Sequence, residues 1–137
     1  MKTLQISFVL ITAVVGSLAL GGTQAHAQQL EPTFIAVQNS STTARNLLST
    51  NTTGVLNPSP NNPLNAGQTT NFTSTSFGSS DAGVVTYSGC RFNWSKIRQT
   101  NNTYTFSRGA TPSGSCTATL VSSNTTTGAY SVRFRIN

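Results

Sequence analysis

The sequence has a single histidine, His26, so residues 27–137 contain none. Ser-His-Asp and Cys-His catalysis both use an imidazole as the general base, and many catalytic zinc sites use histidine ligands. Acidic residues are almost as scarce, because Glu31 and Asp81 are the only two in the chain. A glycosidase needs two carboxyl groups held on either side of one bond, and nothing in the sequence brings these two together. We therefore expect no catalytic residues, no metal ligands and no cofactor, so the chain is predicted not to be an enzyme.

Long hydrophobic runs are also missing, with one exception at the N-terminus. Residues 1–2 supply a positive charge, residues 6–20 are almost purely apolar, and Ala25-His26-Ala27 places small residues at positions −3 and −1 of a cleavage site. The apolar run is shorter than the about 20 residues that a transmembrane helix needs. The pattern predicts a cleavable signal peptide over residues 1–27. It leaves residues 28–137 as one domain that is secreted or periplasmic.

Cysteine is limited to Cys90 and Cys116, and both follow the predicted cleavage site. An even pair in an exported protein favours a disulfide bond, whereas a metal site would need further ligands nearby. Both cysteines fall on the apolar parity of their predicted strands. We therefore expect a bond between them that joins two strand starts at one rim of a sheet.

What is abundant is short and polar. Ser, Thr and Asn supply 49 of the 110 residues after the cleavage site, and the basic residues there outnumber the acidic ones by seven to two. Thr favours strands, while Ser and Asn favour turns and disfavour helices. Disorder is the competing interpretation of such a polar segment. The regular alternation of aromatic and polar residues in the second half of the chain contradicts it.

This alternation predicts the fold class. Four consecutive segments alternate apolar and polar residues with a period of two, and they cover residues 90–95, 103–107, 116–120 and 130–136. Such a series predicts an antiparallel meander of four strands with one buried face. Earlier strands are predicted at residues 33–39 and 83–88, and residues 40–65 are expected to form a long loop with at most one short edge strand. The expected architecture is all-β, a small antiparallel β-sandwich or barrel.

The outward parity of the meander carries the candidate binding residues. They share exposure on what should be one face of one sheet, and they are Arg91, Arg133, Arg135, Thr103, Thr105, Thr117 and Thr119. Such a basic, hydroxyl-rich face suits an anionic surface, a polysaccharide or a lipid. The alternative is a solvated face whose arginines keep the sheet soluble. Nucleic acid is not expected, because the aromatic residues fall on the inward parity.

One family resemblance rests on three short segments, which are Val37-Gln38-Asn39-Ser40, residues 64–69 (LNAGQT) and residues 83–87 (GVVTY). Their order resembles that of the aegerolysin-type β-sandwiches, which are small lipid-binding proteins. The resemblance implies a β-sandwich and an interaction with membranes. The aromatic- and cysteine-bearing C-terminal ending of that family is absent here, so no binding residue is carried over. The sequence thus predicts an exported binding or interaction module, with a structural subunit of a surface assembly and a membrane-interacting protein as alternatives.

Overall fold

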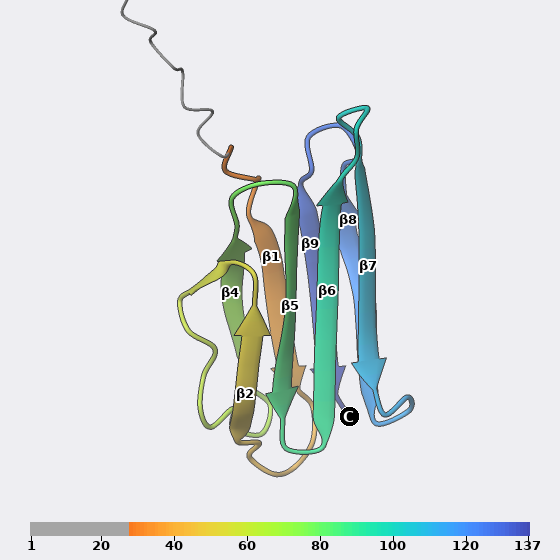
Figure 1. Ribbon diagram of the computed structural model, residues 1–137. Coiled ribbons are helices and arrows are strands. Elements are labelled where there is room, and N and C mark those ends of the chain that lie inside the picture. The colour runs from red at the N-terminus through yellow and green to blue at the C-terminus, as the bar shows by residue number, and fades with distance from the viewer. Residues whose placement is uncertain (1–27) are drawn as a thin grey trace, which may run out of the picture.

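Two β-sheets face each other in the computed structural model, which describes residues 28–137 (Figure 1). The predicted signal peptide, residues 1–27, lies outside the described residues. The nine strands are β1 (Thr33–Asn39), β2 (Leu47–Thr52), β3 (Val55–Asn57), β4 (Thr69–Thr75), β5 (Ser80–Tyr87), β6 (Cys90–Arg98), β7 (Tyr104–Thr111), β8 (Cys116–Ser123) and β9 (Tyr130–Ile136). The five-stranded sheet has the order β3-β4-β1-β9-β8, and the four-stranded sheet has the order β2-β5-β6-β7.

The predicted fold class is confirmed as an all-β sandwich, and the sheets do not close into a barrel. Period-2 alternation produces it, since every second residue of β1, β5 and β9 is buried between the sheets. The described residues include no helix long and apolar enough to span a membrane. Most of the buried core comes from the inward faces of the strands, and Leu30 and Leu64 add to it from segments outside them.

The predicted four-strand meander is wrong. Strands β6 and β7 pair with each other in the four-stranded sheet, whereas β8 and β9 pair in the five-stranded sheet, so the chain changes sheets between β7 and β8. Alternation identifies which side of a strand is buried, and a strand with one apolar side satisfies that pattern in either sheet. Strand β9 instead lies beside β1 in parallel, and β1 pairs with β4 on its other edge.

The predicted long loop over residues 40–65 is also wrong in part, because it contains β2 and β3. These short strands are edges of opposite sheets, β2 against β5 and β3 against β4. An edge strand buries few side chains, and most residues of β2 and β3 are exposed. Their hydrophobic pattern is correspondingly weak, so the sequence does not distinguish them from a loop.

Three aromatic pairs fill the space between the sheets. Phe92 of β6 stacks on Phe134 of β9 with ring centroids 4.9 Å apart. The other two pairs also join one sheet to the other, and they are Phe72–Trp94 at 6.3 Å and Phe106–Tyr130 at 4.8 Å. Aromatic residues bury large apolar areas, and these pairs align the two sheets along their length.

The predicted disulfide between Cys90 and Cys116 is confirmed, with the two Cα atoms 5.8 Å apart. Its expected place at the rim of one sheet is wrong, because Cys90 begins β6 and Cys116 begins β8, and these strands belong to different sheets. The bond therefore cross-links the two layers at one end of the sandwich. We call this the disulfide end.

Candidate binding surface

Four of the predicted surface residues lie together on the outer face of the five-stranded sheet. Thr117 and Thr119 of β8 are directly opposite Arg135 and Arg133 of β9, and all four side chains are exposed. With Val121 they line a hollow of about 210 Å³. Residues two apart on a strand face the same side at a spacing of about 7 Å, so the two guanidinium groups form a short row along β9.

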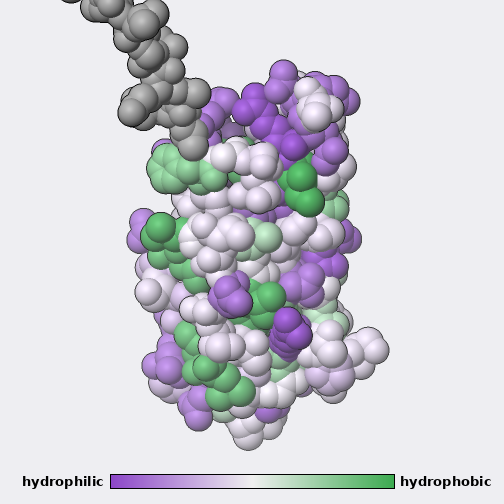
Figure 2. All heavy atoms as spheres, viewed as in Figure 1, coloured by the Kyte–Doolittle hydropathy of each residue, from purple (hydrophilic) through white to green (hydrophobic). Residues whose placement is uncertain are grey.

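The structure does not bring the other three predicted residues to this face. Arg91 and Thr105 project from the outer side of the four-stranded sheet, and Thr103 lies just before β7, where its hydroxyl donates to Asn101 Oδ1 at 2.7 Å. Figure 2 shows this side of the molecule, where apolar residues are scattered among polar ones. The predicted seven-residue face is thus divided between two opposite surfaces. The cause is the chain crossing between β7 and β8.

A larger groove, of about 330 Å³, adjoins the arginines and crosses the outer face of the five-stranded sheet. Its floor is the row in which Asn71 of β4, Ala36 of β1 and Arg133 of β9 are directly opposite one another. Ala36 is small, so this row dips between longer neighbours. The groove and the smaller hollow share Val121 and Arg133, and they therefore adjoin.

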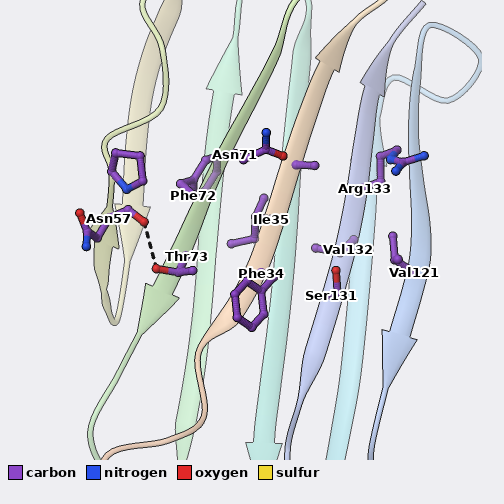
Figure 3. Close-up of a pocket in the computed structure, with 12 residues that line it drawn as sticks. Phe34, Ile35, Asn57, Asn71, Phe72, Thr73, Val121, Ser131, Val132 and Arg133 are labelled. Atoms are coloured by element: carbon purple, nitrogen blue, oxygen red, sulfur yellow. Dashed lines mark hydrogen bonds between the residues drawn. The ribbon is translucent and has the colours of Figure 1, made fainter.

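Phe34 is the exposed aromatic residue of this groove, since Phe72, which also lines it, is buried. It belongs to β1, points outward between Thr73 and Ser131, and is 54% exposed. Figure 3 shows Asn57 and Thr73 on one side of Phe34 and Arg133 and Val121 on the other, with Thr73 Oγ1 donating to the Asn57 carbonyl oxygen at 2.9 Å. The groove therefore combines an exposed apolar ring with amide, hydroxyl and guanidinium groups.

Sequence reasoning missed Phe34, Ala36 and Asn71 as members of a site. One local signal was present, since Phe34 is a large aromatic residue on the parity opposite to that of Ile35 and Val37. The decisive fact is not local, because β1 lies beside β9 through a parallel pairing that joins the first and last strands. Only this pairing places Phe34 within reach of Arg133.

The outer face of the five-stranded sheet is positively charged because the chain has few acidic side chains. Among the described residues the acidic side chains are Glu31 and Asp81, and neither lies on this surface. Asp81 is completely buried between the sheets, and Glu31 precedes β1 at the end opposite the disulfide. Arg133 and Arg135 are therefore positive charges without a neutralising side chain on their own face, which favours an anionic ligand.

A second polar cluster lies inside the sandwich, at the end remote from the disulfide, which we call the polar end. Asp81 Oδ1 accepts hydrogen bonds from the hydroxyls of Ser74 at 2.6 Å and Ser76 at 2.7 Å, and Asp81 Oδ2 accepts one from Thr33. Lys96, opposite Asp81 in β6, donates through Nζ to the Glu31 carbonyl oxygen. Burial lowers the pKa of Lys96 below its usual 10.5, and the negative charges of Asp81 and Glu31 oppose that shift.

These side chains cannot act on an outside substrate, because Thr33, Ser74, Ser76, Asp81 and Lys96 are all at least 97% buried. Residues 28–137 also hold no group of three or more Cys, His, Asp or Glu side chains that could bind a metal ion. The accessible chemistry of the described chain is therefore that of its outer faces.

Comparison with known proteins gives no family: no protein-family model matches this chain, and no curated protein matches it either. What the groove binds must be inferred from its own residues.

Proposed function

We propose that the chain is an exported, non-catalytic binding module whose ligand is an anionic polysaccharide, held in the groove on the outer face of the five-stranded sheet. One observation carries the proposal: Arg133 and Arg135 stand beside a groove with an exposed aromatic residue, on a face without acidic side chains. The disulfide supports export, since such bonds persist in oxidising compartments, secreted or periplasmic.

The groove suits a sugar chain because both are amphipathic. A pyranose ring has apolar faces that can rest on Phe34, and hydroxyls that can pair with the amide of Asn71 and the hydroxyls of Thr73 and Ser131. A guanidinium group binds a carboxylate or sulfate through two parallel, charge-assisted hydrogen bonds. Arg133 and Arg135, in a row along β9, would then bind successive acidic groups of an extended sugar chain.

The test is the double variant Arg133→Ser with Arg135→Ser, assayed by calorimetry against polygalacturonate, dextran sulfate and uncharged dextran. Each lost charge-assisted hydrogen bond is worth about 1.5–3 kcal/mol, so we expect binding of the acidic chains to weaken roughly tenfold or more. Wild-type affinity should also fall with added salt, because exposed charges are screened within about 10 Å at 0.1 M ionic strength. Uncharged dextran should bind weakly to both proteins.

Arg91→Ser is the matched control, since it removes the same charge from the opposite face of the sandwich. It should leave binding unchanged. An equal loss in Arg91→Ser and in a single Arg133→Ser variant would show that net charge alone attracts the polymer, and the groove would then not be the site.

A second control separates the surface from the core. The arginine variant should change the free energy of unfolding by no more than about 0.5 kcal/mol. Phe134 lies between the two arginines in sequence but is completely buried, so Phe134→Ala should cost about 3–5 kcal/mol.

The two alternative functions are further outcomes of the same experiment. The aegerolysin-like alternative predicts tight binding to anionic phospholipid vesicles, with leakage of their contents and no preference for the polysaccharide. A structural subunit of a surface assembly predicts concentration-dependent oligomers in size-exclusion chromatography. Either result, without polysaccharide binding, would contradict the proposed function.

A further inference from the structure

The buried cluster at the polar end contains an unusual pair. Asp81 is the only aspartate in the entire sequence, and Lys96 is the only lysine among the described residues, where every other cationic side chain is an arginine. These two residues are directly opposite each other in the antiparallel pairing of β5 and β6. Both point inward, and both side chains are 0% exposed. An amine that can act as a nucleophile and a carboxyl group are thus enclosed together, away from water.

The surroundings of Asp81 match the needs of acyl chemistry. Two hydroxyls, those of Ser74 and Ser76, donate to the same oxygen, Oδ1, at 2.6 and 2.7 Å. Paired donors on one carbonyl oxygen stabilise the negative charge that develops there when a nucleophile adds to the carbon. The Thr33 hydroxyl binds the other oxygen, Oδ2. The carboxyl group therefore has one oxygen, Oδ1, held by two donors and a second, Oδ2, held by one, so Oδ2 is the oxygen less strongly retained.

We propose that Lys96 and Asp81 condense to an intramolecular amide bond that covalently joins β5 to β6. A proton first moves from the Lys96 ammonium to Asp81 Oδ2, which leaves a neutral amine and a neutral acid. The lone pair of Nζ then attacks Cγ, forming the C–N bond. Oδ2 leaves as water, carrying the proton it already held and one proton from the amine. One amine and one acid give one amide and one water, and no other reactant is needed.

The geometry brings the two groups within reach. Directly opposite residues of antiparallel strands have Cβ atoms about 5 Å apart. Lys96 Nζ donates to the Glu31 carbonyl oxygen in the structure, and in the proposed step it turns from there toward Asp81 Cγ. Holding reactants side by side in a fixed site removes most of the entropic barrier to their reaction. Exclusion of water also favours a reaction that releases water.

The product fits the cluster better than the charged pair does. Burying separate charges is costly, and the amide removes both of them from the interior. Oδ1 remains the carbonyl oxygen of the amide, so it continues to accept the hydrogen bonds from Ser74 and Ser76. The remaining N–H of the amide can still donate to the Glu31 carbonyl oxygen. Burial also lowers the pKa of Lys96, which increases the fraction of neutral, nucleophilic amine.

The test is the mass of the folded protein after reduction and alkylation of its disulfide. We expect it to be lighter than the sequence requires by the mass of one water molecule. Trypsin cleaves after Arg91, Lys96 and Arg98, so the unlinked protein releases residues 46–91, with Asp81, and residues 92–96, with Lys96, as separate peptides. If the amide forms, Lys96 is no longer a cleavage site, and residues 92–98 stay joined to residues 46–91. Tandem mass spectrometry should find them as one branched peptide that is not cleaved after Lys96.

Two variants make the result decisive. Lys96→Met removes the nucleophile and should restore the full sequence mass. Asp81→Asn keeps an acyl group, and its condensation would release ammonia and give a product of the same mass as the cross-linked wild type. A folded wild-type protein at full mass, with separate peptides, would overturn the proposal. A water loss that persists in Lys96→Met would do the same, because it would indicate dehydration of Asp81 with its own backbone. Neither outcome affects the groove, so the two proposals fail independently.

Discussion

The two ends of the sandwich connect the same two sheets by different physical means. At the disulfide end, one covalent bond between Cys90 and Cys116 links β6 to β8. At the polar end, Asp81 of the four-stranded sheet accepts hydrogen bonds from three hydroxyl groups of the other sheet and the segment that follows β4. A disulfide stabilises mainly by restricting the unfolded chain, whereas a buried carboxyl group depends on every partner in the folded state. The polar end should therefore respond more strongly to a single substitution.

The largest effect is expected for Asp81→Ala. It leaves three buried hydroxyls without their acceptor and removes the negative charge opposite Lys96, and removing one member of a buried charged cluster costs about 3–5 kcal/mol. Urea unfolding measures this loss. Ser74→Ala is the matched control, because it removes one donor and leaves the carboxyl group with two, and it should cost about 1–2 kcal/mol. If Asp81→Ala lowered the free energy of unfolding by less than Ser74→Ala, the Asp81 carboxyl group would not be what holds the two sheets together at the polar end.

The disulfide end should show the next largest effect. Replacing both Cys90 and Cys116 by Ala removes a cross-link between residues 26 apart in sequence, which is worth roughly 3 kcal/mol in the chain-entropy model. Both residues are buried, so Ala at each position keeps the site apolar. The double variant should stay folded with a lowered urea midpoint. A variant as stable as the wild type would mean that contacts between the sheets hold this end without the bond.

Raising the pH should change the contributions of the two ends to the free energy of unfolding in opposite directions. At the disulfide end, burial raises the pKa of Tyr87 from 10.0 to about 12. The unfolded chain then loses the phenol proton first, so the contribution of Tyr87 is complete below pH 10 and falls by about 2–3 kcal/mol between pH 10 and 12. At the polar end, burial lowers the pKa of Lys96 below 10.5, so a free amine there makes stability rise as pH approaches 10.5.

Unfolding free energies measured from pH 8 to 12 separate these contributions. Tyr87→Phe should remove part of the alkaline loss, and the part that remains belongs to Tyr130, whose pKa burial also raises. Lys96→Met should remove the rise in the free energy of unfolding that the wild type shows below pH 10.5. If Lys96 is already bound in an amide, wild type and Lys96→Met will show no such rise. An alkaline loss that is unchanged in Tyr87→Phe would contradict the buried environment of that phenol.

The contrast between the ends also explains how much could be predicted. Two cysteines in a chain predicted to be exported are enough to indicate a bond from the sequence alone, and the bond is confirmed. Local patterns place Asp81 in a turn, and a single acidic residue among many hydroxyl residues predicts nothing about its burial. Its surroundings come from β1, β4 and β6, and Thr33 is 48 residues away in sequence. Local patterns do not specify contacts over such distances.

The candidate binding surface was likewise predictable only in part. Alternation correctly places Arg133 and Arg135 on the exposed side of β9 and Phe134 in the core, because that parity is a property of one strand. It groups Arg91 with them wrongly, since the assignment of strands to sheets is not local. The groove itself requires β1 to pair in parallel with β9, which sets Phe34 and Ala36 beside Ser131 and Arg133.

By itself, the sequence determined the strand-rich composition, the buried side of each strong strand, the bonded cysteines and the shortage of acid and imidazole groups. These are properties of single segments or of the chain as a whole. Only the tertiary structure decided which sheet each strand joins, that the disulfide crosses between layers, and that Asp81 meets Lys96 in the interior. The physical reason is that one apolar side can be buried against either sheet with similar gain, so the packing of the complete set of strands selects the arrangement.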